Sequence, residues 1–262
     1  MAKKLGFALG SGGSRGVAHV GFLKAMEENG IFPDYIAGTS MGAVVGSCYA
    51  LGMSSEEMMQ AINKTKPSEL FDLSLNPLGN GALLRSNKMR KKLSKFLKKA
   101  TFEQLKIPFC AVATDLVTGK TVVKKTGSVL DGVVASSTIP GIFKPIEDNG
   151  MVLVDGGVTC RVPIDEVREL GAEVVVAVDV LGKVCEKKRK YNMLSVLFRM
   201  VDIIDSELVE HRKKRQKPNL FLIPDLGDMS QYKFKDLKMA YEKGYELGIR
   251  NVKKIKQLIT EE

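Results

Sequence analysis

Short apolar runs alternate with longer amphipathic stretches along the chain, and this alternation is the first indication of a fold. Apolar runs that predict strands lie at 4–9, 35–37, 108–115, 120–124, 151–154, 173–180 and 219–223. Stretches that predict helices lie at 17–29, 43–51, 87–99, 129–137, 164–170, 191–217 and 234–259. Such alternation is typical of α/β proteins, in which helices cover both faces of a mostly parallel sheet. The 262 residues contain no internal repeat and no linker, so one domain is expected.

Three short segments add detail to this pattern. Residues 66–86 contain Pro67, Pro77 and two glycines, which predict a surface loop or lid. The pair Thr118-Gly119 separates two apolar runs and predicts a hairpin. Residues 54–57 read Ser-Ser-Glu-Glu, the pattern of a capped helix start.

Composition and charge limit the classes of protein that need to be considered. Hydrophobic residues make up 44% and charged residues 27% of the chain, which excludes a wholly disordered or membrane-embedded protein. The net charge of +10 favours an anionic partner, meaning nucleic acid, a phospholipid surface or an acidic substrate. The longest uncharged run, 35–53, is too polar for a transmembrane helix. The N-terminus carries no signal-peptide pattern, so a cytoplasmic location is expected.

The few histidines and cysteines narrow the chemistry further. The four cysteines have neither C-x-x-C spacing nor a paired histidine, so no metal site is expected: Cys48, Cys110, Cys160 and Cys185. A mechanism that needs an imidazole has only His19 and His211 to use. His19 follows a glycine loop and is more simply a packed side chain. His211 lies in a charge run that is typical of a solvated face.

The strongest local signal is the G-x-S-x-G sequence at 38–42, which lies between a predicted strand and a predicted helix. In a nucleophile elbow the serine occupies a sharp, strained turn, and flanking glycines leave the room that this turn requires. The following helix directs its N–H groups and positive dipole end toward the reaction. We therefore interpret Ser40 as a candidate nucleophile, with an ordinary glycine-serine turn as the alternative.

A second glycine loop, Gly10-Ser11-Gly12-Gly13-Ser14-Arg15-Gly16, lies at another strand-to-helix junction. Glycines at such a junction let backbone N–H groups converge on an anion, either a phosphate or an oxyanion. The spacing departs from the G-x-G-x-x-G dinucleotide fingerprint because Gly16 comes one place late. A phosphate-binding P-loop is excluded because no Gly-Lys-Ser/Thr follows.

If Ser40 is a nucleophile it needs a base, and a Ser-His-Asp triad fits the two histidines badly. A carboxylate is the remaining option. Three acids end apolar strands and point toward the same edge of the sheet: Asp115, Asp155 and Asp179. Asp155 is followed by Gly-Gly, which permits close backbone approach. An aspartate in a turn after a strand is an equally good interpretation of Asp155 and the better interpretation of Asp115 and Asp179.

Taken together and in this order, the motifs resemble the patatin-like phospholipase family. The glycine loop ending in Arg15-Gly16, the G-x-S-x-G sequence and Asp155-Gly156-Gly157 match its pattern, and residues 135–143 are similar to its segment upstream of the catalytic acid. The resemblance spans about residues 5–180 and is closest to small bacterial members. It implies a three-layer α/β/α sandwich. The basic, helical C-terminal extension at about 188–262 matches no motif.

The resemblance also implies a role for each matched residue. Ser40 becomes the nucleophile and Asp155 the base of a Ser-Asp dyad. The implied oxyanion hole comprises Gly12, Gly13, Ser14, Arg15 and Met41, and the motif glycines are Gly10, Gly16, Gly38, Gly42, Gly156 and Gly157. Ser11 departs from the family's third loop glycine. The implied enzyme is a carboxylic ester hydrolase of phospholipase A, lysophospholipase or esterase type, with a lipid or other ester substrate and no cofactor or metal.

The basic surplus leaves other readings open. Residues 87–99 suit an amphipathic helix that lies on an anionic membrane as a peripheral contact, but a helix with an apolar core face and a solvated basic face is the simpler interpretation. A nucleotide-binding protein that uses the loop at 10–16 is one alternative function. A non-catalytic regulator that binds nucleic acid through 187–190 and 212–217 is another, although no nucleic-acid motif supports it.

Overall fold

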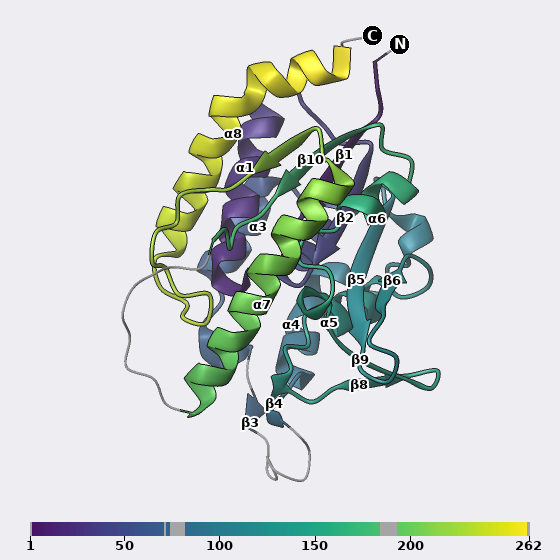
Figure 1. The fold of residues 1–262 in the computed structure, drawn as a ribbon, viewed down its shortest axis with the longest axis vertical. Helices are drawn as coiled ribbons and strands as arrows, with labels where there is room; N and C mark the ends of the chain where they lie inside the picture. The colour runs from purple at the N-terminus through teal and green to yellow at the C-terminus, as the bar shows by residue number, and fades with distance from the viewer. Residues whose placement is uncertain (1, 71, 74–81, 184–192, 261–262) are drawn as a thin grey trace.

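The computed structural model describes residues 2–70, 72–73, 82–183 and 193–260, and an eight-stranded sheet organises this part of the chain (Figure 1). Its strands are β1 (Leu5–Leu9), β2 (Tyr35–Thr39), β5 (Phe109–Asp115), β6 (Thr121–Lys124), β8 (Ile146–Asp148), β9 (Met151–Asp155), β10 (Val174–Val178) and β11 (Leu220–Leu222). Their order is β11-β10-β1-β2-β5-β9-β8, with β6 paired to β5. The pairs from β11 to β5 are parallel, whereas β6, β8 and β9 join antiparallel. The predicted mostly parallel sheet is therefore confirmed.

Helices cover both faces of this sheet, as the α/β pattern predicts. The helices are α1 (Val17–Glu28), α2 (Met41–Leu51), α3 (Ser55–Asn63), α4 (Asn87–Leu97), α5 (Val129–Ser136), α6 (Ile164–Glu169), α7 (Met193–Gln216) and α8 (Leu237–Thr260). Leu5, Phe7 and Leu9 of β1 share one core with α1, α2 and α8, while Ala8 packs with α6 on the opposite face. Gly6 lies on the α6 face, where a Cβ would come within 2.4 Å of Ala172. The small residues let α6 approach the sheet closely.

The C-terminal segment is an integral part of the molecule. Helix α8 packs along α1, and its Gly244 lies so close to α1 that a Cβ there would overlap the carbonyl oxygen of Ala18. Helix α7 runs across the front of the molecule in Figure 1. The described part of the expected extension therefore returns to the fold, and the loop between β11 and α8 reaches the glycine loop at 10–16.

Several predictions about local structure are confirmed and one is wrong. Strands β5 and β6 form the predicted hairpin, and Ser54 and Glu57 form the predicted capping box of α3. Within the predicted loop at 66–86, β3 (Asp72–Leu73) and β4 (Ala82–Arg85) instead pair in a small sheet with β7 (Gly141–Phe143). These strands are too short to show a period in the sequence. The rest of the loop prediction, at 71 and 74–81, lies outside the described residues, as do the basic residues 187–190 and Cys185.

None of the helices in the described part of the chain is long and apolar enough to cross a membrane. The uncharged run at 35–53 forms β2 and α2, with the Ser40 turn between them.

Candidate active site

Ser40 lies in the sharp turn between β2 and α2 and adopts a backbone conformation with φ 55° and ψ −122°. A positive φ is strained for a residue with a side chain, and such strain persists only where the surroundings impose it. The flanking glycines are the reason that the turn is feasible. A Cβ at Gly42 would lie 2.1 Å from the oxygen of Leu9, and one at Gly38 would lie 2.5 Å from the oxygen of Gly42. The turn has the geometry of a nucleophile elbow.

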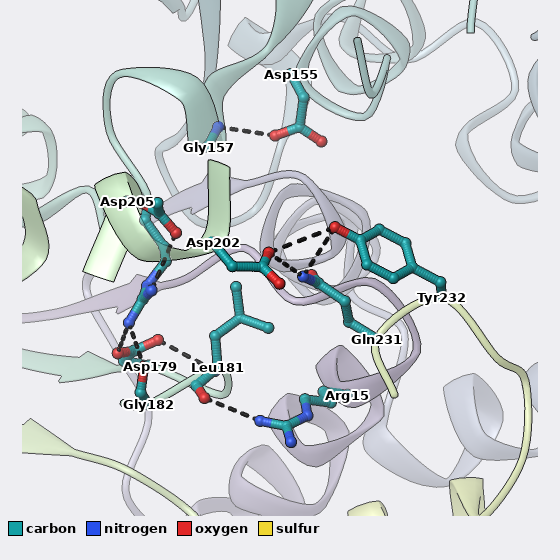
Figure 2. Close-up of polar contacts among 11 residues, drawn as sticks. Arg15, Asp155, Gly157, Asp179, Leu181, Gly182, Asp202, Asp205, Gln231 and Tyr232 are labelled. Carbon is teal, nitrogen blue, oxygen red and sulfur yellow. Dashed lines mark hydrogen bonds and ion pairs between the residues drawn. The ribbon is translucent and has the colours of Figure 1, made fainter. Parts of the chain in front are cut away.

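Asp155 ends β9 and faces this turn. The hydroxyl of Ser40 donates to Asp155 Oδ2 at 2.5 Å, and the N–H of Gly157 donates to Oδ1 at 2.8 Å (Figure 2 shows the second bond). Gly156 provides the close approach expected of this motif, since a Cβ there would lie 2.2 Å from the oxygen of Val112 on β5. The two motifs, 115 residues apart in sequence, thus meet through one hydrogen bond.

Asp155 is buried, and this burial changes its acidity. Burial raises the pKa of Asp155 to about 7, and the hydrogen bonds from Ser40 and Gly157 offset only part of that effect. Desolvation has this direction because it penalises the ionised form of a carboxyl group. A carboxyl group with a pKa near neutrality can both accept and return a proton at physiological pH, which an ordinary aspartate does poorly.

The other two candidate acids have structural roles. Asp115 accepts hydrogen bonds from Val117 and Thr118 in the hairpin turn, and these bonds lower its pKa. Asp179 forms an ion pair with Arg161 at 2.5 Å, with both side chains buried. Neither carboxylate has a contact with Ser40. Of the three, the structure brings Asp155 to Ser40.

The glycine loop shows which of its N–H groups are available. The N–H of Ser14 donates to the carbonyl of Gln231, and that of Arg15 donates to the carbonyl of Gly12. The expectation that these two residues donate to an oxyanion therefore needs correction, because both groups already have acceptors. The N–H groups of Gly12, Gly13 and Met41 have no acceptor among the residues that the structure describes. Met41 also begins α2, at the positive end of its dipole.

The side chain of Arg15 holds the loop in place. Its guanidinium donates to three carbonyl oxygens, those of Met229, Leu181 and Gly227, at 2.7 to 2.9 Å (Figure 2 shows the bond to Leu181). The Ser14 hydroxyl adds a bond to the carbonyl of Ser230 at 2.9 Å. Arg15 is thus a positioning residue that joins the glycine loop to the loop before α8.

His19 supports the same loop from the other side. Its Nε2 lies 2.8 Å from the carbonyl oxygen of Gly10, and the ring is fully buried. Burial lowers the pKa of His19 to about 4, so the imidazole is neutral at physiological pH. The structural reading of this histidine is confirmed. His211 is exposed on α7, as the charge run around it indicates.

Sequence reasoning missed a polar network beside Ser40. Arg161 bridges Asp179 and Asp205, and the carboxylate of Asp202 accepts hydrogen bonds from Gln231 and Tyr232 (Figure 2). Burial raises the pKa of Asp205 to about 6. Asp202 and Asp205 come from α7, and Gln231 and Tyr232 come from the loop before α8, where the sequence carries no motif. Of the residues in this network, only Asp179 was a candidate from the sequence, because it follows a predicted strand.

Two kinds of cavity open at Ser40. An apolar cavity of about 330 Å³ is lined by Leu84, Ile142, Phe143 and other apolar residues. It shares Met41, Val44, Leu93 and Phe234 with an inner apolar cavity of about 140 Å³ that reaches Met53 and Met58. A further cavity of about 70 Å³, which we call the polar cavity because it is lined by Asp155, Asp202 and Asp205, is also lined by apolar residues such as Val158 and Val201. Ser40 lines both the apolar and the polar cavity.

Helix α4 lines the apolar compartment and is not an unpartnered lipid-binding helix. Leu93 and Leu97 are buried in the core, and Met89 and Phe96 pack against it. The hypothesis that the apolar face at 87–99 inserts into a membrane is therefore wrong, because that face is already covered. The alternative, an apolar core face with a solvated basic face, describes α4 correctly.

The chain is similar to known proteins in sequence and in fold. The family model described as "Patatin-like phospholipase" matches residues 7–168. An uncharacterized NTE family protein of Mycobacterium tuberculosis is 38% identical over 181 residues, which are 68% of this chain and 49% of that protein. Lysophospholipase NTE1 of Cryptococcus neoformans is 32% identical over 187 residues, 68% of this chain and 11% of that protein. The chain thus spans at most about half the length of these relatives.

A solved structure supports the fold over nearly the whole chain. VipD from Legionella pneumophila superimposes with a TM-score of 0.59 over 97% of this chain and 67% of its own, at 13% sequence identity. At this identity the likeness concerns the fold alone, and it includes the C-terminal segment that the family model does not reach.

Proposed function

Because the chain belongs to the patatin-like phospholipase family, we propose that it is a serine acyl hydrolase that cleaves carboxyl esters of lipids through Ser40 and Asp155. The observation that carries the proposal is the 2.5 Å hydrogen bond from the Ser40 hydroxyl to Asp155, formed on a strained turn at the bottom of an apolar cavity. A nucleophile with a base in direct contact, beside free backbone N–H groups, is the arrangement that acyl transfer requires.

In the first half-reaction Ser40 Oγ attacks the ester carbonyl carbon while its proton passes to Asp155 Oδ2. The carbonyl oxygen becomes an oxyanion that accepts hydrogen bonds from the N–H groups of Gly12, Gly13 and Met41. When the tetrahedral intermediate collapses, the carbon–oxygen bond to the alcohol breaks and Asp155 protonates the leaving oxygen. The acyl group remains on Ser40. Losing one such oxyanion donor typically lowers turnover by about 10²–10³-fold.

In the second half-reaction water replaces the alcohol. Asp155 takes a proton from the water, whose oxygen attacks the acyl-enzyme carbonyl, and the same N–H groups stabilise the second oxyanion. Collapse breaks the bond to Ser40 Oγ, which recovers its proton from Asp155. The products are a carboxylic acid and an alcohol. A pKa near 7 suits Asp155 to both directions of proton transfer.

The two compartments indicate how an ester would lie across Ser40. The apolar cavities provide the surface against which an acyl chain would be buried. Met41 and Val44 line both cavities, so a long acyl chain could extend past them toward Met53. The polar cavity accommodates the alcohol part of the ester. This division supports lipid esters of the phospholipase A, lysophospholipase or esterase type.

The test is covalent labelling of the intact protein with a fluorophosphonate, read by mass spectrometry. We expect one adduct on the wild type, none on Ser40→Ala, and slow labelling of Asp155→Ala. Ser47→Ala is the matched control, because Ser47 of α2 is also buried but donates to the carbonyl of Val44 rather than to a carboxylate. Absence of an adduct on folded wild type, or an adduct that persists in Ser40→Ala, would refute the proposed nucleophile.

A further inference from the structure

Helix α7 exposes apolar side chains where a surface helix normally exposes polar ones. Val196, Met200, Ile204 and Leu208 recur every four residues, so they form one row along the helix. Val201 and Ile203 flank this row, and all six side chains are between 40% and 57% exposed. From Val196 to Leu208 the row extends over about 18 Å at the 1.5 Å rise of an α-helix. We call these six residues the α7 apolar row.

Two acidic residues of α7 face the opposite way, toward the protein. Asp205 pairs with Arg161 at 3.0 Å and Asp202 bonds to Gln231 at 3.0 Å, both at the site beside Ser40. Between Val196 and Leu208 the helix thus turns these two acids inward and exposes six apolar side chains, with the exposed Glu207 among them, which departs from the usual surface helix. The internal polar network explains the inward acids, but it gives no reason for six apolar residues on the outside.

The apolar row is concentrated, and it reaches the mouth of the site. Among the described residues thirteen large hydrophobic side chains are exposed, and six of them belong to this one helix. Two others, Val158 and Tyr232, line the polar cavity at Ser40 together with Val201 of the row. A contiguous exposed apolar patch on a protein surface is the mark of an interaction site. Here that surface adjoins the entrance to Ser40.

Charge indicates what covers this surface. Besides Asp202 and Asp205, which are turned to the site, the described α7 carries five basic residues and two acidic ones. The basic residues follow the apolar row closely at its C-terminal end, as Arg212, Lys213, Lys214 and Arg215. The whole chain adds a net charge of +10. An apolar row with a basic margin is the pattern of a helix that lies in the interface of an anionic membrane.

We propose that the α7 apolar row docks the protein on a membrane that contains anionic phospholipid, with the mouth of the Ser40 site turned to the lipid. The row inserts among the headgroups and upper acyl chains, and the basic end of α7 meets the anionic surface. The orientation of the site rests on the proposed function, since a lipid ester then enters the cavity without crossing water. Membrane binding itself does not depend on catalysis.

The test is co-sedimentation with vesicles of equimolar phosphatidylcholine and phosphatidylglycerol, in a Ser40→Ala background so that the lipid stays intact. Met200→Glu combined with Ile204→Glu places two charges in the row, at positions 52% and 57% exposed. Phe32→Glu combined with Ile249→Glu is the matched control, with the same charge change at positions 61% and 42% exposed away from α7. We expect the row variant to lose about tenfold or more in binding, and the control to retain most of it.

Other outcomes would overturn the proposal. Equal losses in both double variants would mean that net charge alone governs binding, and unchanged binding of the row variant would remove α7 from the interface. If light scattering shows a wild-type dimer that the row variant converts to a monomer with unchanged vesicle binding, the row contacts a second copy. Met200→Leu with Ile204→Leu, which keeps the row apolar, should bind like the parent, and its failure to do so would contradict an apolar contact.

A parallel assay with Ser40 intact separates this proposal from the proposed function. The row variant should hydrolyse the water-soluble ester p-nitrophenyl butyrate at the wild-type rate and lose activity on vesicle phospholipid. If the wild type hydrolyses neither substrate but its vesicle binding still depends on the row, the docking surface stands and the hydrolase proposal fails. Equal loss on both substrates would mean that the substitutions damage the site, and would overturn the docking argument.

Discussion

Replacing Asp155 by asparagine separates two effects of the buried carboxylate: its effect on the free energy of unfolding and its contribution to catalysis. The wild-type side chain accepts one hydrogen bond on each oxygen, from Ser40 and from Gly157. Asparagine retains both contacts, because its oxygen accepts from Gly157 while its amide donates to the Ser40 oxygen. The substitution therefore removes the ionisable group without leaving a buried polar atom unpaired.

The size of the stability effect follows from the pKa of Asp155. Burial raises this pKa to about 7, whereas an aspartate in an unfolded chain titrates near 3.9. The folded protein therefore holds a proton that the unfolded chain has lost between about pH 4 and pH 7. The associated stability is fully present below pH 4 and disappears as pH rises through 7. The difference of about three pKa units corresponds to about 4 kcal/mol at pH 8.

We expect the Asp155→Asn variant to avoid the destabilisation caused by ionisation of the buried carboxyl group, and to lack the general base. Its free energy of unfolding relative to the wild type should rise by about 2 to 3 kcal/mol between pH 5 and pH 8. Turnover of a neutral ester should fall by about 10²–10⁴-fold, the usual contribution of general acid–base catalysis. The variant would thus be more stable and less active at pH 8.

Urea denaturation of both proteins at pH 5 and pH 8 measures this difference. Other buried acids, such as Asp205 with its pKa near 6, titrate in both proteins and cancel in the comparison. Parallel stability–pH curves for the wild type and the variant would refute the reasoning, because they would show that Asp155 is ionised at little cost. An Asp155→Asn variant that is less stable than the wild type at pH 8 would also refute the reasoning.

Four further predictions concern the same site. The kcat/KM for a neutral ester should rise with pH and level off above about pH 7, because Asp155 acts in its ionised form; a flat profile from pH 5 to 9 would contradict this assignment. Gly13→Ala should slow fluorophosphonate labelling by about 10²-fold or more, because its Cβ would lie 2.3 Å from the oxygen of Gln231, whereas Gly119→Ala, with a similar positive φ but open space around it, should label normally. Arg161→Met should cost about 3–5 kcal/mol in urea denaturation, because it leaves two buried carboxylates without their cation. Val44→Phe should narrow the junction of the apolar cavities, and kcat/KM should fall for p-nitrophenyl palmitate but not for the butyrate.

The parts of the site that could be predicted from the sequence are those whose geometry is local. The elbow at Ser40 needs only its own glycines and the elements on each side, and the pentapeptide specifies all of these. The same holds for Asp155, whose Gly-Gly neighbours fit against β5. The alternation of apolar and amphipathic stretches similarly specifies the sheet, because parallel strands such as β1 and β10 are buried over their whole length.

The oxyanion loop was only partly predictable because its free N–H groups depend on a distant segment. The N–H of Ser14 is not free for an oxyanion because it donates to the carbonyl of Gln231, which lies more than 200 residues further along the chain. Nothing in the sequence around Gln231 marks it as a partner of the glycine loop. Asp179 is a similar case. It differs from Asp155 because it forms a buried ion pair with Arg161, and its position at the end of a strand does not reveal this partner. Short strands such as β3 and β7 escaped prediction because pairing alone defines them.

The division between predictable and unpredictable parts has a functional meaning. The family match ends at residue 168 and contains the glycine loop, Ser40 and Asp155, the groups that would make and break bonds. The residues that shape the surroundings of Ser40 and were missed, including Asp202, Gln231 and Phe234, lie beyond it. So does the α7 apolar row. The matched part also supplies most of the apolar cavity lining, so the C-terminal segment adds only part of the surroundings of Ser40, together with the proposed membrane contact. Exchanging that segment for the equivalent part of a relative should change substrate preference and vesicle binding while Ser40 keeps its reactivity toward a fluorophosphonate.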